Sequence, residues 1–192
     1  MKIKIVVIIP ARLGSLRLKN KNILPIKNIP MVAYVAREAK KSKFNPIIFV
    51  SSESEIIRKI CVKYDLNFIK RPKRLAKKFV EKQEVIVSAA KYILRKFKYK
   101  PEIVVSLQCN SPEFKCKDLD NAIKFFKKSF PGKEKKELIS VGRDNMQNAA
   151  FRIMTWKAVF QKSLSTNISI FYTDYTDIHY KADYLLTLKK IK

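Results

Sequence analysis

The stretch KIVVIIPARLGSLRLKNKNI, residues 4–23, contains the pattern that decides the fold. An apolar run rich in Val and Ile leads up to Ile9 and ends at Pro10. A continuous run of this kind is typical of a strand buried on both faces of a largely parallel sheet. A loop with several cations, Gly14 and Ser15 follows. Because ligands of open α/β sheets bind beyond the carboxyl ends of the strands, we expect this loop to bind one.

Strands and helices are expected to alternate along the chain. Runs of strand length occupy residues 3–9, 46–50, 67–69, 103–107, 138–141 and 168–172. Apolar stripes with helical period lie between them and begin at Met31, Ile56, Val85 and Leu119. The alternation predicts an α/β fold, a three-layer α/β/α sandwich with a Rossmann-like, mostly parallel sheet. We expect residues 1–192 to form a single domain, with a small dimerisation or substrate excursion around 143–166, where the alternation weakens.

The composition is that of a globular protein without a membrane segment. No apolar run approaches the roughly 20 residues that cross a bilayer, and the first run is too short for the core of a signal peptide. We therefore expect a cytoplasmic protein with no membrane insertion. The cysteines, Cys61, Cys109 and Cys116, are odd in number and form no C-x-x-C pair, which argues against a disulfide framework.

The chain is strongly basic, with 42 Lys and Arg against 16 Asp and Glu and a formal net charge of +26. Such a charge attracts phosphates, anionic sugars, nucleic acid or anionic lipid. The lysines are spread along the whole chain, so the high net charge can also reflect a genome-wide bias in amino-acid composition. The cluster KRPKRLAKKF, residues 70–79, can be a nucleic-acid patch or a solvated face. Since the chain shows no nucleic-acid recognition module, a nucleic-acid-binding protein is the alternative and not the expectation.

The loop after Pro10 carries groups that suit a polyphosphate, although it matches neither G-x-x-x-x-G-K-[ST] nor G-x-G-x-x-G. Gly14 and Ser15 can expose backbone N–H groups to an anion. Arg12 can make forked contacts with phosphate oxygens, and Lys21 can supply a point charge. A solvated basic loop is the alternative interpretation.

The order of residues in this loop resembles the signature I-P-A-R-x-G-S-x-R-x-x-x-K-N-[LI] of the cytidylyltransferases that make CMP-activated sugar acids. That family includes the CMP-sialic acid synthetases and the CMP-3-deoxy-manno-octulosonate synthetases. Further family-like segments follow in the same order: VSSESEI at 50–56, RPKRLA at 71–76, LQCNSP at 107–112 and TDIHYKADY at 176–184. The resemblance extends over most of the chain and implies a nucleotide-diphospho-sugar transferase-like fold.

The resemblance implies transfer of CMP from CTP to a 2-keto-3-deoxy sugar acid, with release of pyrophosphate. Such a reaction depends on positioning and on neutralisation of charge. The catalytic groups implied are Arg12, Lys21 and Asp177. The implied nucleotide-binding residues are Pro10, Ala11, Gly14, Ser15, Asn22 and Arg71. Gln108 would meet the sugar or the ribose. Alternatives are a related nucleotidyltransferase with another nucleotide or acceptor, and an inactive nucleotide binder.

The implied cofactor is Mg²⁺, which the family holds with two aspartates near the C-terminus. Asp177 matches the first, whereas His179, the only histidine, aligns with the second. Imidazole is a poor ligand for Mg²⁺. Either Asp177, with Asp174 or water, holds the ion while His179 forms hydrogen bonds, or the site is altered. Asp183 is expected near the start of the last helix, where a carboxylate is favourable.

The binding site for the acidic sugar is less defined by the sequence. A carboxylate substrate needs a cation, and Arg143 and Arg152 are the candidates. Members of the sialic acid branch often dimerise through an inserted region. The resemblance therefore makes a homodimer an expectation, although residues 143–166 are few for that role.

Overall fold

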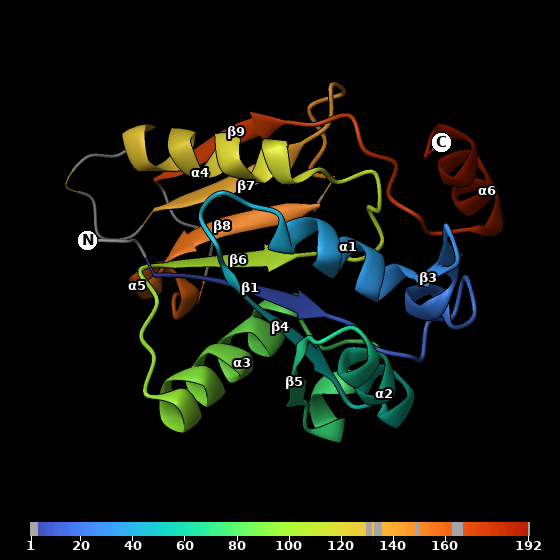
Figure 1. Ribbon diagram of the computed structural model, residues 1–192. Coiled ribbons are helices and arrows are strands. Elements are labelled where there is room, and N and C mark those ends of the chain that lie inside the picture. Colours follow the sequence, from blue (N-terminus) through green and yellow to red (C-terminus); the bar gives the residue numbers. More distant parts are fainter. Residues whose placement is uncertain (1–3, 130–131, 133–135, 149, 163–166, 192) are drawn as a thin grey trace.

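The computed structural model describes residues 4–129, 132, 136–148, 150–162 and 167–191. Its centre is a seven-stranded sheet with the order β5-β4-β1-β6-β8-β7-β9 (Figure 1). The strands are β1 (Ile5–Pro10), β4 (Ile47–Ser52), β5 (Asn67–Lys70), β6 (Ile103–Leu107), β7 (Glu137–Val141), β8 (Phe151–Thr155) and β9 (Ile168–Tyr172). All of them run in one direction except β8, which is antiparallel to both of its neighbours.

Helices cover both faces of this sheet, so the predicted three-layer sandwich is confirmed. On one face, buried side chains of the sheet pack against α1 (Met31–Lys40), α2 (Glu55–Lys63) and α4 (Cys116–Ser129). On the other face they pack against α3 (Lys82–Phe97) and α5 (Trp156–Val159). Among the described residues, no helix is long and apolar enough to cross a membrane.

Smaller elements lie at the carboxyl edge of the sheet. Short 3-10 helices span Lys21–Ile23 and Lys73–Ala76, and a hairpin is formed by β2 (Pro25–Ile26) and β3 (Ile29–Pro30). Lys27 and Asn28 between these strands have φ values of 47° and 63°, as a two-residue turn with both central residues in the left-handed region requires. The last helix, α6 (Lys181–Lys190), packs beside this hairpin through Ile178 and Tyr184.

Strand β8 is the element that the sequence analysis missed. It lies within residues 143–166, yet it pairs with β6 and β7 inside the main sheet. The expected excursion is therefore not found for residues 151–159, whereas residues 163–166 lie outside the described residues. Arg152 interrupts the apolar run that signals a buried strand. A role of this range in dimerisation or substrate binding, and the single domain, stay predictions.

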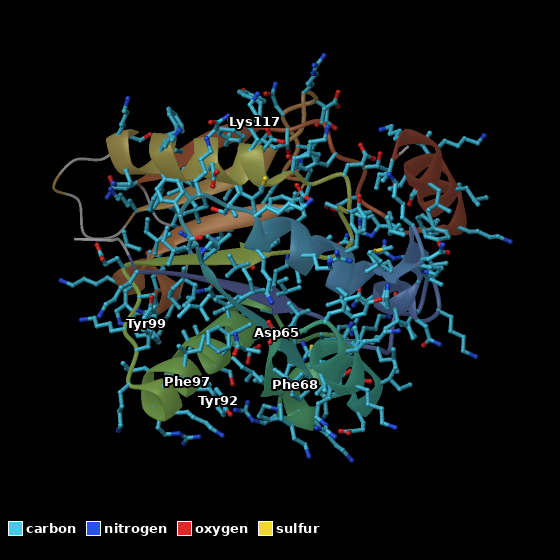
Figure 2. All side chains as sticks on the ribbon, viewed as in Figure 1. Asp65, Phe68, Tyr92, Phe97, Tyr99 and Lys117 are labelled. Carbon is cyan, nitrogen blue, oxygen red and sulfur yellow. The ribbon has the colours of Figure 1, made fainter. Side chains whose placement is uncertain are left out.

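Basic side chains are spread widely over the described surface. Figure 2 shows long side chains with nitrogen tips extending outward from both helical layers and from α6. This distribution agrees with the interpretation that much of the net charge of +26 is compositional. Local arrangements of charge, and not the total, carry the functional argument.

Phe151 tests the contribution of β8 to the core. Its ring is fully buried and contacts Phe114 and Phe171, with ring centroids 6.2 and 5.9 Å away. We expect Phe151→Ala to lower the free energy of unfolding, measured in urea, by about 3–5 kcal/mol because it leaves a cavity. The control is Phe79→Ala, whose ring is 88% exposed and whose loss should change that free energy by about 0.5 kcal/mol or less. Equal effects of the two substitutions would contradict the core role of β8.

Candidate active site

A cavity of about 300 Å³ lies at the carboxyl edge of the sheet. Its walls come from the loop after β1, the segment from the end of β5 to the start of α3, and the residues after β6. The predicted site residues that line it are Pro10, Arg12, Ser15, Lys21, Asn22, Arg71, Gln108 and His179. Residues 9–22 therefore contribute to a cavity, as the position of the loop after β1 predicts.

Hydrogen bonds from neighbouring segments hold the loop after β1. Asn22 is buried, donates from Nδ2 to the Arg12 carbonyl at 2.8 Å, and accepts from the Cys109 thiol at 3.1 Å. Burial raises the pKa of Cys109 to about 12, so the thiol stays protonated and can donate. Asn22 was expected to bind the nucleotide, and these hydrogen bonds show that it also holds the loop.

Two predicted nucleotide-binding residues do not line the cavity. The Ala11 side chain is fully buried in the core, and its N–H donates to the Ser51 carbonyl at 2.9 Å. This placement gives no support to a direct contact between Ala11 and a nucleotide. Gly14 is exposed, and a Cβ added there would meet no atom within 4 Å. Packing of the described chain therefore does not require glycine at this position.

An ion pair joins the segments that follow β4 and β5, and its carboxylate also holds the loop after β1. The Arg71 side chain is only 4% exposed, and its Nη2 lies 2.5 Å from Oε2 of Glu53. The other oxygen of Glu53 accepts from the Leu13 N–H at 3.0 Å. Arg71 Nε is buried and has no hydrogen-bond partner among the described residues. Sequence reasoning missed Glu53, for which the available signal was an acidic residue just after a strand in a basic chain.

The C-terminal segment docks onto the residues that follow β6. Asp177 accepts hydrogen bonds through Oδ1 from Asn110 Nδ2 at 3.1 Å and from Ser111 Oγ at 2.6 Å. The N–H of Ile178 donates to the Asn110 carbonyl at 2.9 Å, and Lys21 Nζ donates to the Ile178 carbonyl at 2.5 Å. Asp177 thus lies beside the cavity and is tied to two of its walls.

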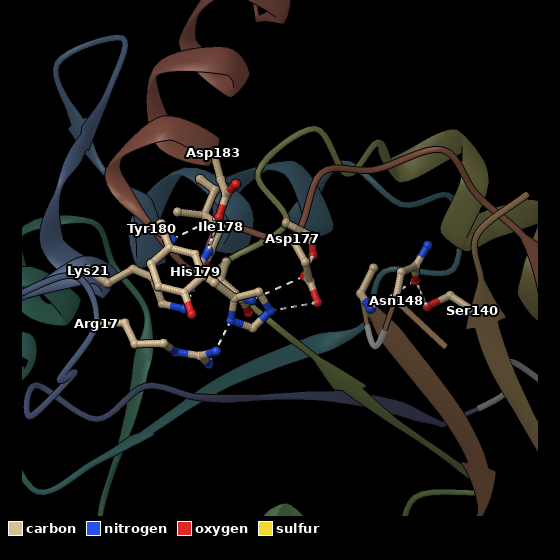
Figure 3. Close-up of polar contacts among 12 residues, drawn as sticks. Arg17, Lys21, Ser140, Asn148, Asp177, Ile178, His179, Tyr180 and Asp183 are labelled. Carbon is tan, nitrogen blue, oxygen red and sulfur yellow. Dashed lines mark hydrogen bonds and ion pairs between the residues drawn. The ribbon is translucent and has the colours of Figure 1, made fainter. Parts of the chain in front are cut away.

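His179 lies between a cation and a carboxylate (Figure 3). Its Nδ1 is 2.8 Å from Arg17 Nη2, and its Nε2 is 3.7 Å from Asp177 Oδ2. Because arginine only donates, Nδ1 must accept, which puts the proton of a neutral imidazole on Nε2. Desolvation lowers the pKa of His179, and the positive charges of Lys21 and Arg17 lower it further. This geometry favours hydrogen bonding by His179 over metal ligation.

Asp183 stabilises the start of α6, as predicted. Its Oδ2 accepts from the N–H groups of His179 and Tyr180, both at 2.8 Å. These two backbone hydrogen bonds lower the pKa of the Asp183 carboxyl. The carboxylate therefore keeps His179 in place from the backbone side.

The donor set for a metal ion is small. In the described part of the chain, no three His, Cys, Asp or Glu side chains come together as a metal site. Asp174 is exposed, lies 3.7 Å from Arg143 and lines a different cavity, so it does not join Asp177. Oδ2 of Asp177 remains available, apart from His179 at 3.7 Å. Since Mg²⁺ often takes one or two carboxylates plus substrate phosphates, Asp177 fits such a site and His179 does not.

Positive charge is concentrated in the cavity. Desolvation lowers the pKa of Lys21, and Arg17 and Arg12 lower it further, although the Asp177 carboxylate acts in the opposite direction. Cations at close range raise one another's energy, and a polyanion in the cavity would relieve that repulsion. The arrangement is therefore suited to a ligand with several negative charges.

The chain matches the model of the Cytidylyltransferase family over residues 6–184. It is 40% identical to an N-acylneuraminate cytidylyltransferase of Escherichia coli over 76 residues, which are 40% of this chain and 18% of that protein. It is 35% identical to the post-translational flagellin modification protein B of Campylobacter coli over 117 residues, 60% of this chain and 50% of that protein. The matched segments span half or less of these two relatives.

Solved structures share the fold at low sequence identity. A CMP:2-keto-3-deoxy-manno-octonic acid synthetase in complex with CTP superposes with a TM-score of 0.77 over 98% of both chains, at 14% identity. A cytidylyltransferase from Leptospira borgpetersenii superposes with a TM-score of 0.70 over 95% of this chain and 84% of that chain, at 19% identity. The fold is thus nucleotide-diphospho-sugar transferase-like. All residues that line the cavity fall within the range matched by the family model, and the chain belongs to the cytidylyltransferase family.

Proposed function

We propose that this protein transfers CMP from CTP to a 2-keto-3-deoxy sugar acid and releases pyrophosphate. The observation that carries the proposal is the placement of Arg12 and Lys21 in one cavity at the carboxyl edge of the sheet. Relatives named for N-acylneuraminate, 3-deoxy-manno-octulosonate, legionaminic acid and pseudaminic acid support an acidic sugar as acceptor. Because these names differ in the acid, the proposal extends to the class of acceptor only.

In the proposed reaction the anomeric hydroxyl of the sugar attacks the α-phosphorus, and the bond to pyrophosphate breaks. Negative charge grows on the leaving group, and preorganised cations stabilise it. Arg12 and Lys21 supply these cations. Lys21 is already held by the Ile178 carbonyl, so it loses little freedom when the ligand binds. Arg71, held by Glu53, lines the same cavity and adds a further positive charge for the nucleotide.

The loop around Gly14 approaches the triphosphate most closely in this proposal. No described residue lies within 4 Å of a Cβ built at Gly14, which supports the approach of a ligand as the reason for glycine here. Ser15 and Pro10 line the same wall of the cavity. Backbone N–H groups in such a loop bind phosphate oxygens at short range.

Mg²⁺ fits the proposal as a companion of the triphosphate. Asp177 would hold the ion together with phosphate oxygens, and Asn110 and Ser111 fix the orientation of its carboxylate. When bound, the ion would neutralise part of the charge on the phosphates. His179 keeps Arg17 beside Asp177. This substitution of an aspartate by histidine favours one alternative, a related nucleotidyltransferase with another nucleotide or acceptor. A cytoplasmic location and a homodimer stay predictions.

The reaction is tested directly by pyrophosphate release. Purified protein is incubated with CTP, Mg²⁺ and a panel of 2-keto-3-deoxy sugar acids. We expect pyrophosphate only when CTP and an acid are both present, and a smaller thermal shift with ATP, GTP or UTP than with CTP. Absence of pyrophosphate with every acid refutes the proposed reaction, and a larger shift with another nucleotide supports the alternative.

Arg12 and Lys21 are tested by truncation. We expect Arg12→Ala and Lys21→Ala each to lower kcat/KM by about 100- to 1,000-fold, the usual loss when one donor to developing charge is removed. The control is Lys59→Ala, an equal change of charge on the exposed side of α2. Unfolding temperatures establish that the variants are folded. Folded variants with unchanged kcat/KM would remove these residues from the mechanism.

The variant Gly14→Ala tests whether the glycine is needed for CTP binding and not for folding. We expect the free energy of unfolding to change by about 0.5 kcal/mol or less, since the added Cβ meets no atom within 4 Å. CTP affinity, measured by calorimetry, should fall by about tenfold or more, because the methyl group occupies space near the phosphates. Unchanged affinity would mean that the triphosphate does not approach this residue.

A further inference from the structure

The acceptor carboxylate needs a cation, and neither arginine named from the sequence supplies a free one. The Arg143 side chain is 83% exposed, lies 3.7 Å from Asp174, and does not line the cavity described above. Arg152 lies 2.6 Å from Glu137, whose side chain is fully buried, and its charge is neutralised there. Arg152 also donates to Gln83 at 2.8 Å. The cation that meets the acceptor must be sought elsewhere.

A second, smaller cavity of about 110 Å³ adjoins the first. It lies on the α3 face of the sheet, and polar side chains dominate its walls. The lining residues are Lys82, Gln83, Ile86, Ser106, Gln147, Arg152 and Met154. Lys82 lines both cavities, so one ammonium group borders the two spaces. The small volume suits a substituent of a sugar and not the ring itself.

Lys82 is the first residue of α3, and its ammonium group makes no hydrogen bond or ion pair with any residue that the structure describes. It is exposed as a residue, yet desolvation at the cavity wall lowers the pKa of Lys82. The Asp177 carboxylate raises that pKa and the Arg152 guanidinium lowers it. The charge on Lys82 is therefore within electrostatic reach of both Asp177 and Arg152.

The chemistry of the acceptor explains why this position matters. In a 2-keto-3-deoxy acid, the carboxylate carbon is bonded directly to the anomeric carbon that carries the attacking hydroxyl. The carboxylate must therefore lie beside the α-phosphate and close to Asp177. A cation that pairs with it has to border the nucleotide cavity and the space next to it. Lys82 meets this requirement.

We infer that Lys82 binds the carboxylate of the acceptor sugar, which enters the smaller cavity, and that this contact selects acids over neutral sugars. The inference rests on the proposed function. Gln83 and Arg152, which are hydrogen-bonded to each other, line the same cavity as Lys82. The flexible, unpaired lysine is the group that can adapt to the substrate.

The test compares two acceptors in the wild-type protein and three variants. One acceptor is a sugar acid that the wild-type protein uses, and the other is the same sugar with its carboxylate converted to the neutral amide. We expect Lys82→Gln to raise KM for the acid by about 10- to 100-fold, the range for loss of a charged hydrogen bond, and to leave KM for CTP within about twofold. Lys82→Arg should restore part of the preference for the acid. Lys91→Gln, an equal change of charge farther along α3, is the control.

The decisive quantity is the ratio of kcat/KM for the acid to that for the amide. Lys82→Gln should bring this ratio close to one, whereas Lys91→Gln should keep the wild-type ratio. A wild-type ratio in Lys82→Gln, or an increase in KM for CTP alone, overturns the inference while the proposed reaction stands. Failure of the wild-type protein to use any acid refutes the proposed reaction itself and the inference with it.

Discussion

Parallel pairing of β1 with β4 on one side and β6 on the other is the constraint on which the site depends. In a parallel sheet all the carboxyl ends lie at one edge, so the segments that follow β1, β4 and β6 meet in space. The loop after β1 brings Arg12, Arg17 and Lys21 to the cavity, and the other two segments hold this loop. Glu53 after β4 accepts from Leu13, and Cys109 after β6 donates to Asn22. The sheet thus brings together three segments that are far apart in the sequence, and hydrogen bonds link them into one wall of the cavity.

Carboxylates are scarce in this chain, and those near the site have defined partners. Glu53 pairs with Arg71, Glu137 pairs with Arg152, and Asp177 accepts from Asn110 and Ser111. A buried ion pair adds little net stability, but loss of one partner leaves a costly uncompensated charge. Their main effect is therefore to place particular cations. The cations without such partners, Lys82 above all, remain to meet a ligand.

The sequence was most informative where the chemistry is local. The apolar run up to Ile9 predicted a strand, which is found, and the cations after Pro10 predicted a binding loop, which lines a cavity. Asp183 was also placed correctly, because helix starts depend on neighbouring residues. Contacts across long distances in the chain were missed. Strand β8 carries Arg152, whose partner Glu137 lies on another strand. No residue next to Arg152 in the sequence indicates this ion pair.

Lys82 was overlooked for the opposite reason. It lies soon after the run of basic residues at 70–79, where the sequence pattern does not distinguish one lysine from its neighbours. Only the fold distinguishes it, by placing it where two cavities meet.

The charge balance around Asp177 follows from the histidine two residues later. A second aspartate at position 179 would add a negative charge and attract both Arg17 and a metal ion. The neutral imidazole still accepts a hydrogen bond from Arg17, so the geometry of the segment survives without that charge. Asp177 interacts with both Lys21 and Lys82, and its negative charge raises the pKa of each lysine. In the proposed reaction, the substrate phosphates would supply most of the negative charge that a divalent cation requires. The proposal thereby makes metal binding dependent on the nucleotide, because among the described residues no three His, Cys, Asp or Glu side chains come together as a metal site.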